Sequence, residues 1–418
     1  MVQRTVLDNG VRVVTELAQD LRSVSLGFWF DVGSRDELPE QQGICHFLEH
    51  MMFKGTRRHS AREIAERIDA LGGQVNAFTT REQTCYYARV LDEHLPEAVE
   101  LLLELLLESS LSPEDIEKEK DVIVEEIRLY EDTPEEMVHD LAAQAALGRH
   151  PAARSVLGAE STVRALTRQD LVSFLEQHYV GPRLVVAACG RLEHGRLVEQ
   201  LAGPLARLAG RGAVRQPQQP AGQSRWLVRA KETEQVHLCV TTPGLAASDH
   251  RRFALLVLDT VMGGGVSSRL FQSLREERGW VYSTYSYPTL LSDAGFFSVY
   301  AGTQPQRAPA VLDLIQQELL AVRERGVARR ELERARKHLK GSLMLSLEST
   351  SQRMSRLARS ELLGEEYLTP DEVLARIDAV HEEQVQELAA AIFDPDRFAF
   401  AGIGNVPWAM QSQAAQAG

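Results

Sequence analysis

The chain is organised around the stretch Gly43-Ile44-Cys45-His46-Phe47-Leu48-Glu49-His50-Met51-Met52-Phe53-Lys54-Gly55-Thr56. Within it, His46 and His50 lie four residues apart, and Glu49 directly precedes the second histidine. On a helix, both imidazoles then project from one face, about 40° apart. Two histidines placed in this way are able to share a tetrahedral zinc ion, and Glu49 flanks the same face, where it can take a proton from a zinc-bound water.

A solvated helix offers a simpler explanation of this pattern, because histidine and glutamate pair at i, i+3 without any metal. The flanking residues argue against it. Buried imidazoles and a buried carboxylate are costly unless they are paired or bound to metal. The motif therefore indicates a site, since its neighbours are apolar: Ile44, Phe47, Leu48, Met51, Met52 and Phe53.

A third zinc ligand has to come from another element, and the acidic helix expected over Pro113–Tyr130 is the best source. Glu119 and Glu126 lie seven residues apart, so two helical turns place them on one face. The alternative is that Glu119 and Glu125 are solvated and Glu126 pairs with a nearby arginine. The spacing alone leaves both interpretations open.

Composition and charge limit the class of protein. The 418 residues are enough for two or more domains, and the formal net charge of −13 disfavours nucleic acid and anionic membranes as partners. The four cysteines show no metal-type spacing and are expected to be reduced. With no signal-peptide pattern at the N-terminus and no apolar run long enough to span a membrane, we expect a cytoplasmic protein.

The order of predicted elements repeats along the chain. The first half begins with a hairpin at Asn9-Gly10 and ends with an apolar strand over Arg183–Gly190, which Arg397–Gly404 echoes at the end of the second half. We therefore predict an α+β fold of two homologous α/β-sandwich halves, each an antiparallel sheet packed with helices, related by duplication. The predicted boundaries are 1–205 for a zinc-binding domain, 206–225 for a linker rich in Gly, Pro and Gln, and 226–418 for a domain without the histidine motif.

Together, the stretch Gly43–Thr56, the acidic helix and the second-half stretch Gly263–Tyr282 resemble the pitrilysin/insulinase family of zinc peptidases. The His-x-x-Glu-His order is that of the inverzincins. The likeness is to the short bacterial members, which are similar to the β subunit of the mitochondrial processing peptidase, and it covers nearly the whole chain. The resemblance implies His46, His50 and Glu126 as the zinc ligands, Glu49 as the general base and Glu119 as a supporting acid.

Two further stretches match the family. Gly73–Thr79 resembles its active-site edge strand, which implies that Asn76 and Ala77 bind an extended substrate peptide. The segment Leu274–Tyr282 matches one whose arginine and tyrosine reach the substrate backbone, which implies Arg275 and Tyr282 for those catalytic and substrate-binding roles. Trp280 departs from the smaller residue that the family usually has there.

The resemblance implies a zinc-dependent endopeptidase, with one zinc per chain, that cleaves unfolded oligopeptides or presequence-like basic segments inside a closed chamber. It also implies a homodimer, or a heterodimer with a related subunit that lacks the zinc motif. Two alternatives stay open: a non-catalytic subunit, and a chaperone-like peptide-binding subunit. A third, S-ribosylhomocysteine lyase, uses the same motif in a single short domain, which the duplicated length disfavours.

Overall fold

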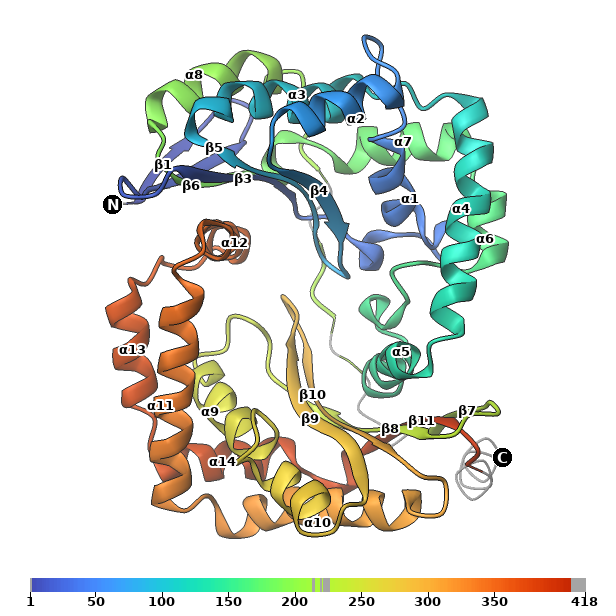
Figure 1. The fold of residues 1–418 in the computed structure, drawn as a ribbon, viewed down its shortest axis with the longest axis vertical. Helices are drawn as coiled ribbons and strands as arrows, with labels where there is room; N and C mark the ends of the chain where they lie inside the picture. Colours follow the sequence, from blue (N-terminus) through green and yellow to red (C-terminus); the bar gives the residue numbers. More distant parts are fainter. Residues whose placement is uncertain (1, 213–214, 219, 221–225, 407–418) are drawn as a thin grey trace. The chain divides into compact units, whose positions relative to one another are not determined.

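A computed structural model of the chain describes residues 2–212, 215–218, 220 and 226–406. The chain forms two compact units, and each is assembled from three segments. The first contains residues 1–128, 154–216 and 346–367, and the second contains residues 129–153, 217–345 and 368–418. Figure 1 shows the elements of both units.

The first unit is built on a six-stranded sheet with the order β1-β2-β6-β3-β5-β4. All neighbouring strands are antiparallel except β2 and β6, which are parallel. The predicted hairpin is confirmed, because Gly10 at its turn has a φ of +88°, which favours glycine. The strands are β1 (Val2–Val6), β2 (Arg12–Leu17), β3 (Ser23–Phe30), β4 (Gln74–Thr79), β5 (Thr84–Leu91) and β6 (Leu184–Gly190).

Helices cover both faces of this sheet. The larger apolar core lies on the face that packs against the N-terminal helices, where Phe28, Phe47 and Leu102 are fully buried. Among the described residues, the helix that packs against the opposite face is α12, through Trp29, Val185 and Leu357. The helices are α1 (Ile44–Met51), α2 (Ala61–Ala70), α3 (Leu95–Glu108), α4 (Pro113–Glu131), α6 (Glu160–Ala165), α7 (Arg168–His178), α8 (His194–Leu205) and α12 (Thr350–Leu363), with the short 3-10 turn η1 (Ser34–Asp36) before α1.

The second unit has a five-stranded sheet with the order β7-β11-β8-β10-β9. Its only parallel pair among the described strands is β7 with β11. One face packs against α9, α10 and α14, and the other packs against α5. The elements are β7 (Trp226–Ala230), β8 (Val236–Pro243), β9 (Val281–Leu290), β10 (Gly295–Thr303), β11 (Ala399–Gly404), α5 (Pro134–Leu147), α9 (Arg252–Met262), the π-helical turn η6 (Phe271–Glu276), α10 (Ala308–Arg325), α11 (Arg329–Ser346), α13 (Pro370–Asp378) and α14 (Glu382–Ile392).

The two sheets share one plan. From β2 onward, the first sheet matches the second strand for strand, with the parallel pair at the same place. By element order α9 is the counterpart of α1, and the glycine-rich stretch from Gly263 follows α9 directly. The predicted α+β class with two sheet-and-helix halves is confirmed. All four cysteines are free and buried.

The units exchange a helix. By element order, α5 and α12 occupy corresponding places in the two halves of the sequence. However, α5 comes from the first half and belongs to the second unit, whereas α12 comes from the second half and belongs to the first unit. The reason is apolar burial: Val138 and Leu141 of α5 pack on the second sheet, and Met354 and Leu357 of α12 pack on the first. Segments of the two compact units therefore alternate along the sequence. The contiguous boundaries 1–205, 206–225 and 226–418 stay a prediction about the halves of the sequence. Of the predicted linker, residues 213–214, 219 and 221–225 lie outside the described residues.

Candidate metal centre

The helix α1 begins at a left-handed glycine and is held at its N-terminus by a buried carboxylate. Gly43 has a φ of +94°, and the Glu37 carboxylate accepts hydrogen bonds from the backbone N–H groups of Gly43 (2.9 Å) and Cys45 (3.0 Å). Burial raises the pKa of Glu37 to about 8, while these hydrogen bonds favour its ionised form. Glu37 thus fixes where α1 starts.

The two histidines of α1 face one another, as their spacing predicts. Their ring centroids lie 4.6 Å apart with an interplanar angle of 68°. His46 is buried, and His50 is half-buried. Burial, together with the neighbouring His50, lowers the pKa of His46 to about 3. His46 is therefore a neutral imidazole at neutral pH, which is the form that binds metal.

Glu126 of α4 completes a group of three metal-type donors. Its Oε2 atom lies 3.7 Å from His46 Nε2 and 3.6 Å from His50 Nε2. Among the residues that the structure describes, these three are the one group of His, Cys, Asp and Glu side chains whose ligand atoms all lie within 4.8 Å of one another. The structure thus brings together the three predicted ligands from two elements.

This donor set fits zinc. Zinc–ligand bonds of about 2.0–2.1 Å in a tetrahedron place neighbouring ligand atoms about 3.3 Å apart. The two observed nitrogen–oxygen distances are slightly longer than this and are too long for hydrogen bonds. The donors therefore surround a common point without being bonded to each other. Two imidazoles and one carboxylate are also the ligand types that catalytic zinc sites use, with a fourth position left for water.

Glu119, the predicted supporting acid, lies next to the Nδ1 atom of His50. Its carboxylate is 2.8 Å from His50 Nδ1 and 2.8 Å from Lys54 Nζ. Burial opposes ionisation of Glu119, but the hydrogen bonds from His50 and Lys54 outweigh it and hold its pKa below the usual value. A carboxylate on Nδ1 fixes the ring orientation and leaves Nε2 to face the metal position.

Glu49 lies on the same helix and makes a different contact. The Thr79 hydroxyl donates a hydrogen bond of 2.6 Å to Glu49 Oε2. Burial raises the pKa of Glu49, and the bond from Thr79 opposes this shift. A carboxylate with a raised pKa beside three metal-type donors has the properties of a general base.

Thr79 is the last residue of β4, which is the edge strand of the first sheet. The predicted peptide-binding residues Asn76 and Ala77 lie on this strand, and β4 pairs with β5 on one side only. The Asn76 side chain accepts a hydrogen bond of 2.8 Å from the N–H of Ala77. The site and the edge strand therefore meet at Thr79.

Arg275 and Tyr282 belong to the second unit. The Arg275 guanidinium lies 5.8 Å from the ring centroid of Tyr282 and 4.9 Å from that of Phe271. The Tyr282 side chain is exposed, with a relative accessibility of 75%. The structure brings these two residues to each other, and their role toward the metal centre stays a prediction.

Sequence reasoning missed three residues that position the site: Glu37, Lys54 and Thr79. Lys54 lies in the stretch Gly43–Thr56 and Thr79 in the stretch Gly73–Thr79, which the sequence analysis had already singled out. The charge of Lys54 and the hydroxyl of Thr79 were the signals that could have identified them as residues that position the site. Glu37 lies in an acidic loop before α1, where no spacing rule connects it to Gly43. Only the fold shows which backbone amides it accepts.

Comparison with known proteins now identifies the class to which this fold and this site belong. Residues 12–160 match the family model described as insulinase (peptidase family M16), and residues 165–339 match the model described as the peptidase M16 inactive domain. The uncharacterized zinc protease YmxG of Bacillus subtilis is 41% identical over 410 residues, which cover 97% of this chain and 100% of the relative. The chain belongs to the insulinase family of peptidases.

Other relatives agree with this assignment. An uncharacterized zinc protease of Streptomyces coelicolor is 44% identical and covers 93% of this chain and 86% of its own. The probable mitochondrial-processing peptidase subunit beta of Arabidopsis thaliana is 33% identical, with 96% of this chain and 78% of the relative covered. The predicted family is confirmed, and the predicted zinc cofactor and hydrolase class agree with these names.

Solved structures share the fold. A protease from Helicobacter pylori matches with a TM-score of 0.91 and 21% identity, over 97% of this chain and 99% of the other. A structure from Pseudomonas fluorescens, described as a peptidase M16 inactive domain, matches with a TM-score of 0.90 and 20% identity, over 96% and 98%. No helix within the described ranges has both the length and the apolar composition needed to span a bilayer.

Proposed function

We propose that the chain is a zinc-dependent endopeptidase that cleaves unfolded oligopeptides or presequence-like segments inside a closed chamber. The observation that supports this most strongly is the convergence of His46, His50 and Glu126 next to Glu49. The insulinase family is described as a peptidase family, and several relatives are named zinc proteases.

The ligands in this proposal are His46, His50 and Glu126. Zinc bound there supplies a Lewis acid that lowers the pKa of water and polarises a carbonyl oxygen. Glu49 accepts the proton of the attacking water on its carboxylate and then donates it to the leaving amine. The Thr79 hydroxyl holds Glu49 Oε2, so that the base keeps one orientation.

Substrate binding in this proposal uses the open side of β4. An extended peptide adds to an edge strand through main-chain hydrogen bonds, which give affinity that depends little on side chains. For a peptide to reach the N–H of Ala77, the Asn76 side chain has to release it. Asn76 and Ala77 would then bind the substrate backbone next to Glu49.

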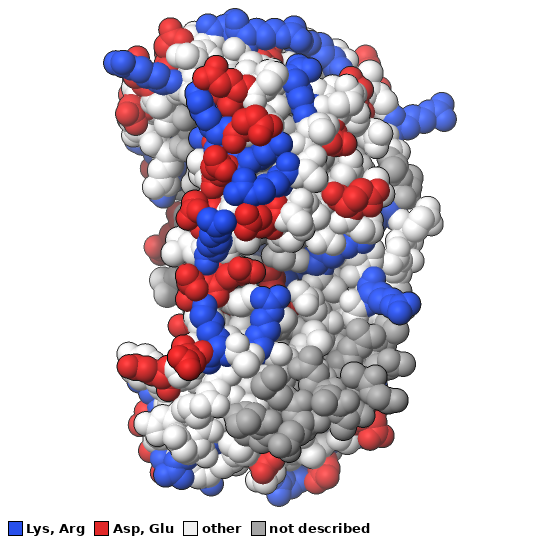
Figure 2. All heavy atoms as spheres, turned by 90° about the vertical axis from the view of Figure 1, so that its right-hand side faces the viewer, with Lys and Arg blue, Asp and Glu red and all other residues white. Residues whose placement is uncertain are grey.

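The second unit is proposed to contribute Arg275 and Tyr282, a role that rests on the family resemblance. The exposed Tyr282 hydroxyl is free to donate to a developing oxyanion, and one such donor is worth about 3 kcal/mol. The proposed domain roles follow: residues 1–205 supply the metal centre, and residues 226–418 supply substrate contacts. Figure 2 shows basic and acidic side chains interspersed over the coloured part of the face that it presents.

The proposed partners are peptide substrates and a second subunit. One relative is named as the β subunit of a processing peptidase, which supports a heterodimer with a related chain lacking the zinc motif, or a homodimer of this chain. Light scattering of the purified chain distinguishes a self-associating protein from one that needs a sister subunit.

The test compares the wild type with Glu49→Gln on a library of short unstructured peptides, with mass-spectrometric detection and metal analysis of both proteins. We expect the wild type to cleave peptides and the variant to lose at least about 100-fold in rate, because general base catalysis contributes about 10²–10⁴-fold. Both proteins should retain equal zinc. The matched control is Glu125→Gln, since Glu125 lies next to Glu126 but its side chain is exposed and pairs with Arg128 at 2.6 Å.

Three outcomes contradict the proposal in different ways. Equal activity of Glu49→Gln and the wild type removes Glu49 as the base. Bound zinc without cleavage by the wild type, alone or with a related subunit, favours the chaperone-like peptide-binding role. A wild-type protein that binds no zinc removes the metal centre.

A further inference from the structure

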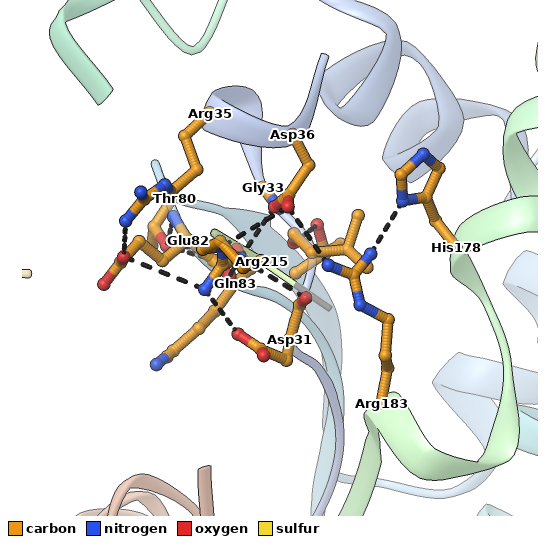
Figure 3. Close-up of polar contacts among 12 residues, drawn as sticks. Asp31, Gly33, Arg35, Asp36, Thr80, Glu82, Gln83, His178, Arg183 and Arg215 are labelled. Atoms are coloured by element: carbon orange, nitrogen blue, oxygen red, sulfur yellow. Dashed lines mark hydrogen bonds and ion pairs between the residues drawn. The ribbon is translucent and has the colours of Figure 1, made fainter. Parts of the chain in front are cut away.

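A buried arginine from the segment that joins the two halves of the sequence connects to the surroundings of the metal centre. Arg215 lies in the first unit, and its side chain is 14% exposed. Its guanidinium donates to Asp31 Oδ1 (2.8 Å), Asp36 Oδ2 (2.7 Å) and the backbone carbonyl of Glu82 (3.1 Å). Figure 3 shows Arg215 between these groups.

The groups around Arg215 form a network of opposite charges. Arg183 donates to the other carboxylate oxygen of Asp36 at 3.1 Å and contacts His178 Nδ1 at 2.7 Å. Arg35 forms an ion pair with Glu82. Burial alone would lower the pKa of Arg215, but Asp36, Asp31 and Glu82 raise it above its usual value. The guanidinium is therefore charged at every pH of interest, and removing it leaves Asp31 without its 2.8 Å ion pair.

From this network, a first route leads to Glu49. The N–H groups of Ser34 and Arg35 donate to the carbonyls of Thr80 (3.1 Å) and Arg81 (3.0 Å) in the turn between β4 and β5. Gly33 approaches the same turn so closely that a Cβ atom there would lie 2.4 Å from the Thr80 carbonyl oxygen. Because Arg215 bonds both Asp36 and Glu82, it holds η1 against this turn.

The turn directly follows Thr79, the residue that donates to Glu49. A shift of the turn therefore moves the hydroxyl that orients the base.

A second route leads to the zinc ligands. Asp36, the partner of Arg215, is followed in the chain by Glu37. The Glu37 carboxylate accepts from the first amides of α1, and its backbone carbonyl accepts from Arg154. Since α1 carries His46 and His50, the position of η1 sets where these two imidazoles lie relative to Glu126.

Arg215 also lies at a boundary of the chain. The first unit ends at Gln216 in this segment, and the N–H of Gln218 donates to Asp293 Oδ2 (2.8 Å) within the second unit. The segment is thus attached to each unit within one or two residues of the point where the chain passes between them.

We propose that Arg215 is a positioning residue for the metal centre, which holds η1 and the β4–β5 turn together and thereby orients α1 and Thr79. This inference rests on the proposed peptidase function for its catalytic part. Its structural part, the placement of η1, α1 and the turn, is independent of the reaction.

The test uses full-length Arg215→Met and, as a matched control, Arg211→Met, since Arg211 is an exposed arginine of the same segment. We expect Arg215→Met to lose about 10- to 100-fold in kcat, the range seen when groups that orient metal ligands are removed. KM for a peptide and the zinc stoichiometry should change little. Hydrogen exchange of the metal-free protein should be faster at residues 33–37, 43–47 and 79–83, and Arg211→Met should match the wild type in every measurement.

A second variant separates positioning from a general loss of stability. In Arg215→Met combined with Asp31→Asn, a cation and an anion are both removed, so no unpaired carboxylate is left buried. We expect this double variant to fold and still show reduced kcat and fast exchange. Low, non-denaturing guanidinium chloride should restore part of the activity of Arg215→Ala by occupying the same position.

The proposal is overturned if the folded double variant keeps wild-type kcat and wild-type exchange at η1 and the turn. If the wild type itself cleaves no peptide, the proposed function fails, but the exchange measurements still decide the positioning role: unchanged exchange overturns it, and faster exchange confined to the three named ranges supports it.

Discussion

His50 Nδ1 lies 2.8 Å from Glu119 Oε1, on the side of the imidazole away from the Nε2 atom that faces Glu126 at 3.6 Å. One ring thus lies between Glu119, next to its Nδ1 atom, and Glu126, which in the proposed site shares its metal position. Lys54 neutralises the outer oxygen of Glu119 at 2.8 Å. The two acids, both on α4, therefore make different contacts although they lie on the same helical face.

Replacing Glu119 tests this arrangement. We expect Glu119→Gln to weaken zinc binding by about 10- to 100-fold, because an outer-shell carboxylate fixes the tautomer and raises the basicity of a ligating histidine. Competition with a chromophoric chelator measures the affinity. Glu114→Gln is the control, since Glu114 is an exposed acid of the same helix paired with Lys118. Equal affinity of Glu119→Gln and the wild type would show that Lys54 and the fold orient His50 without this acid.

The hydroxyl of Thr79 provides a second prediction. In Thr79→Val, Glu49 loses its 2.6 Å donor while the volume of the side chain is kept. We expect kcat to fall about 10-fold or more with unchanged zinc content, because a base that is misplaced by a fraction of an ångström is much less effective. Thr79→Ser retains a hydroxyl and should recover most of the activity. A fully active Thr79→Val would mean that Glu49 is oriented by other groups.

A half-buried acid in the second unit, Asp259, predicts a pH dependence of stability. Burial raises the pKa of Asp259 to about 7, although the Ser286 hydroxyl donates to its carboxylate at 2.6 Å. The unfolded chain ionises this acid near pH 4, so between pH 4 and 7 the folded state binds more protons than the unfolded state. Its contribution to stability is therefore largest below pH 4 and falls by up to about 1.4 kcal/mol per pH unit as the pH rises to 7.

Urea unfolding of Asp259→Asn across this pH range measures the effect. The variant should show a flatter loss of stability between pH 4 and 7 than the wild type, while Asp313→Asn, a change at an exposed acid of α10, should follow the wild type. Identical pH profiles for Asp259→Asn and the wild type would show that Asp259 is ionised in the folded protein.

The exchanged helix α12 provides a fourth prediction. Leu357 is buried against the face of the first sheet that Trp29 and Val185 line. We expect Leu357→Ala to destabilise the protein by about 2–5 kcal/mol through lost burial and a cavity. Arg359→Ala changes an exposed residue of the same helix and should cost less than about 0.5 kcal/mol. Denaturant unfolding compares them, and a Leu357→Ala value similar to that of the control would show that α12 contributes little to the first unit.

The sequence by itself determined the local elements and the face on which the chemistry lies. The four-residue spacing of His46 and His50 places two imidazoles together on any helix, and the turn at Asn9-Gly10 has one favourable hairpin geometry. These features depend on backbone geometry within a few residues. Local periodicity therefore predicts them, and the repeated order of elements predicts two similar sheets.

Only the tertiary structure decided which distant groups meet. The spacing of Glu119 and Glu126 left their roles open, and the packing of α4 beside α1 turns one toward His50 Nδ1 and the other toward both Nε2 atoms. The sequence patterns of α5 and α12 also do not indicate which sheet each helix covers, because an apolar face packs on any apolar surface within reach. The partners of Glu37 and Arg215 were hidden for the same reason: hydrogen bonds between residues far apart in sequence depend on the whole fold, which local spacing does not encode.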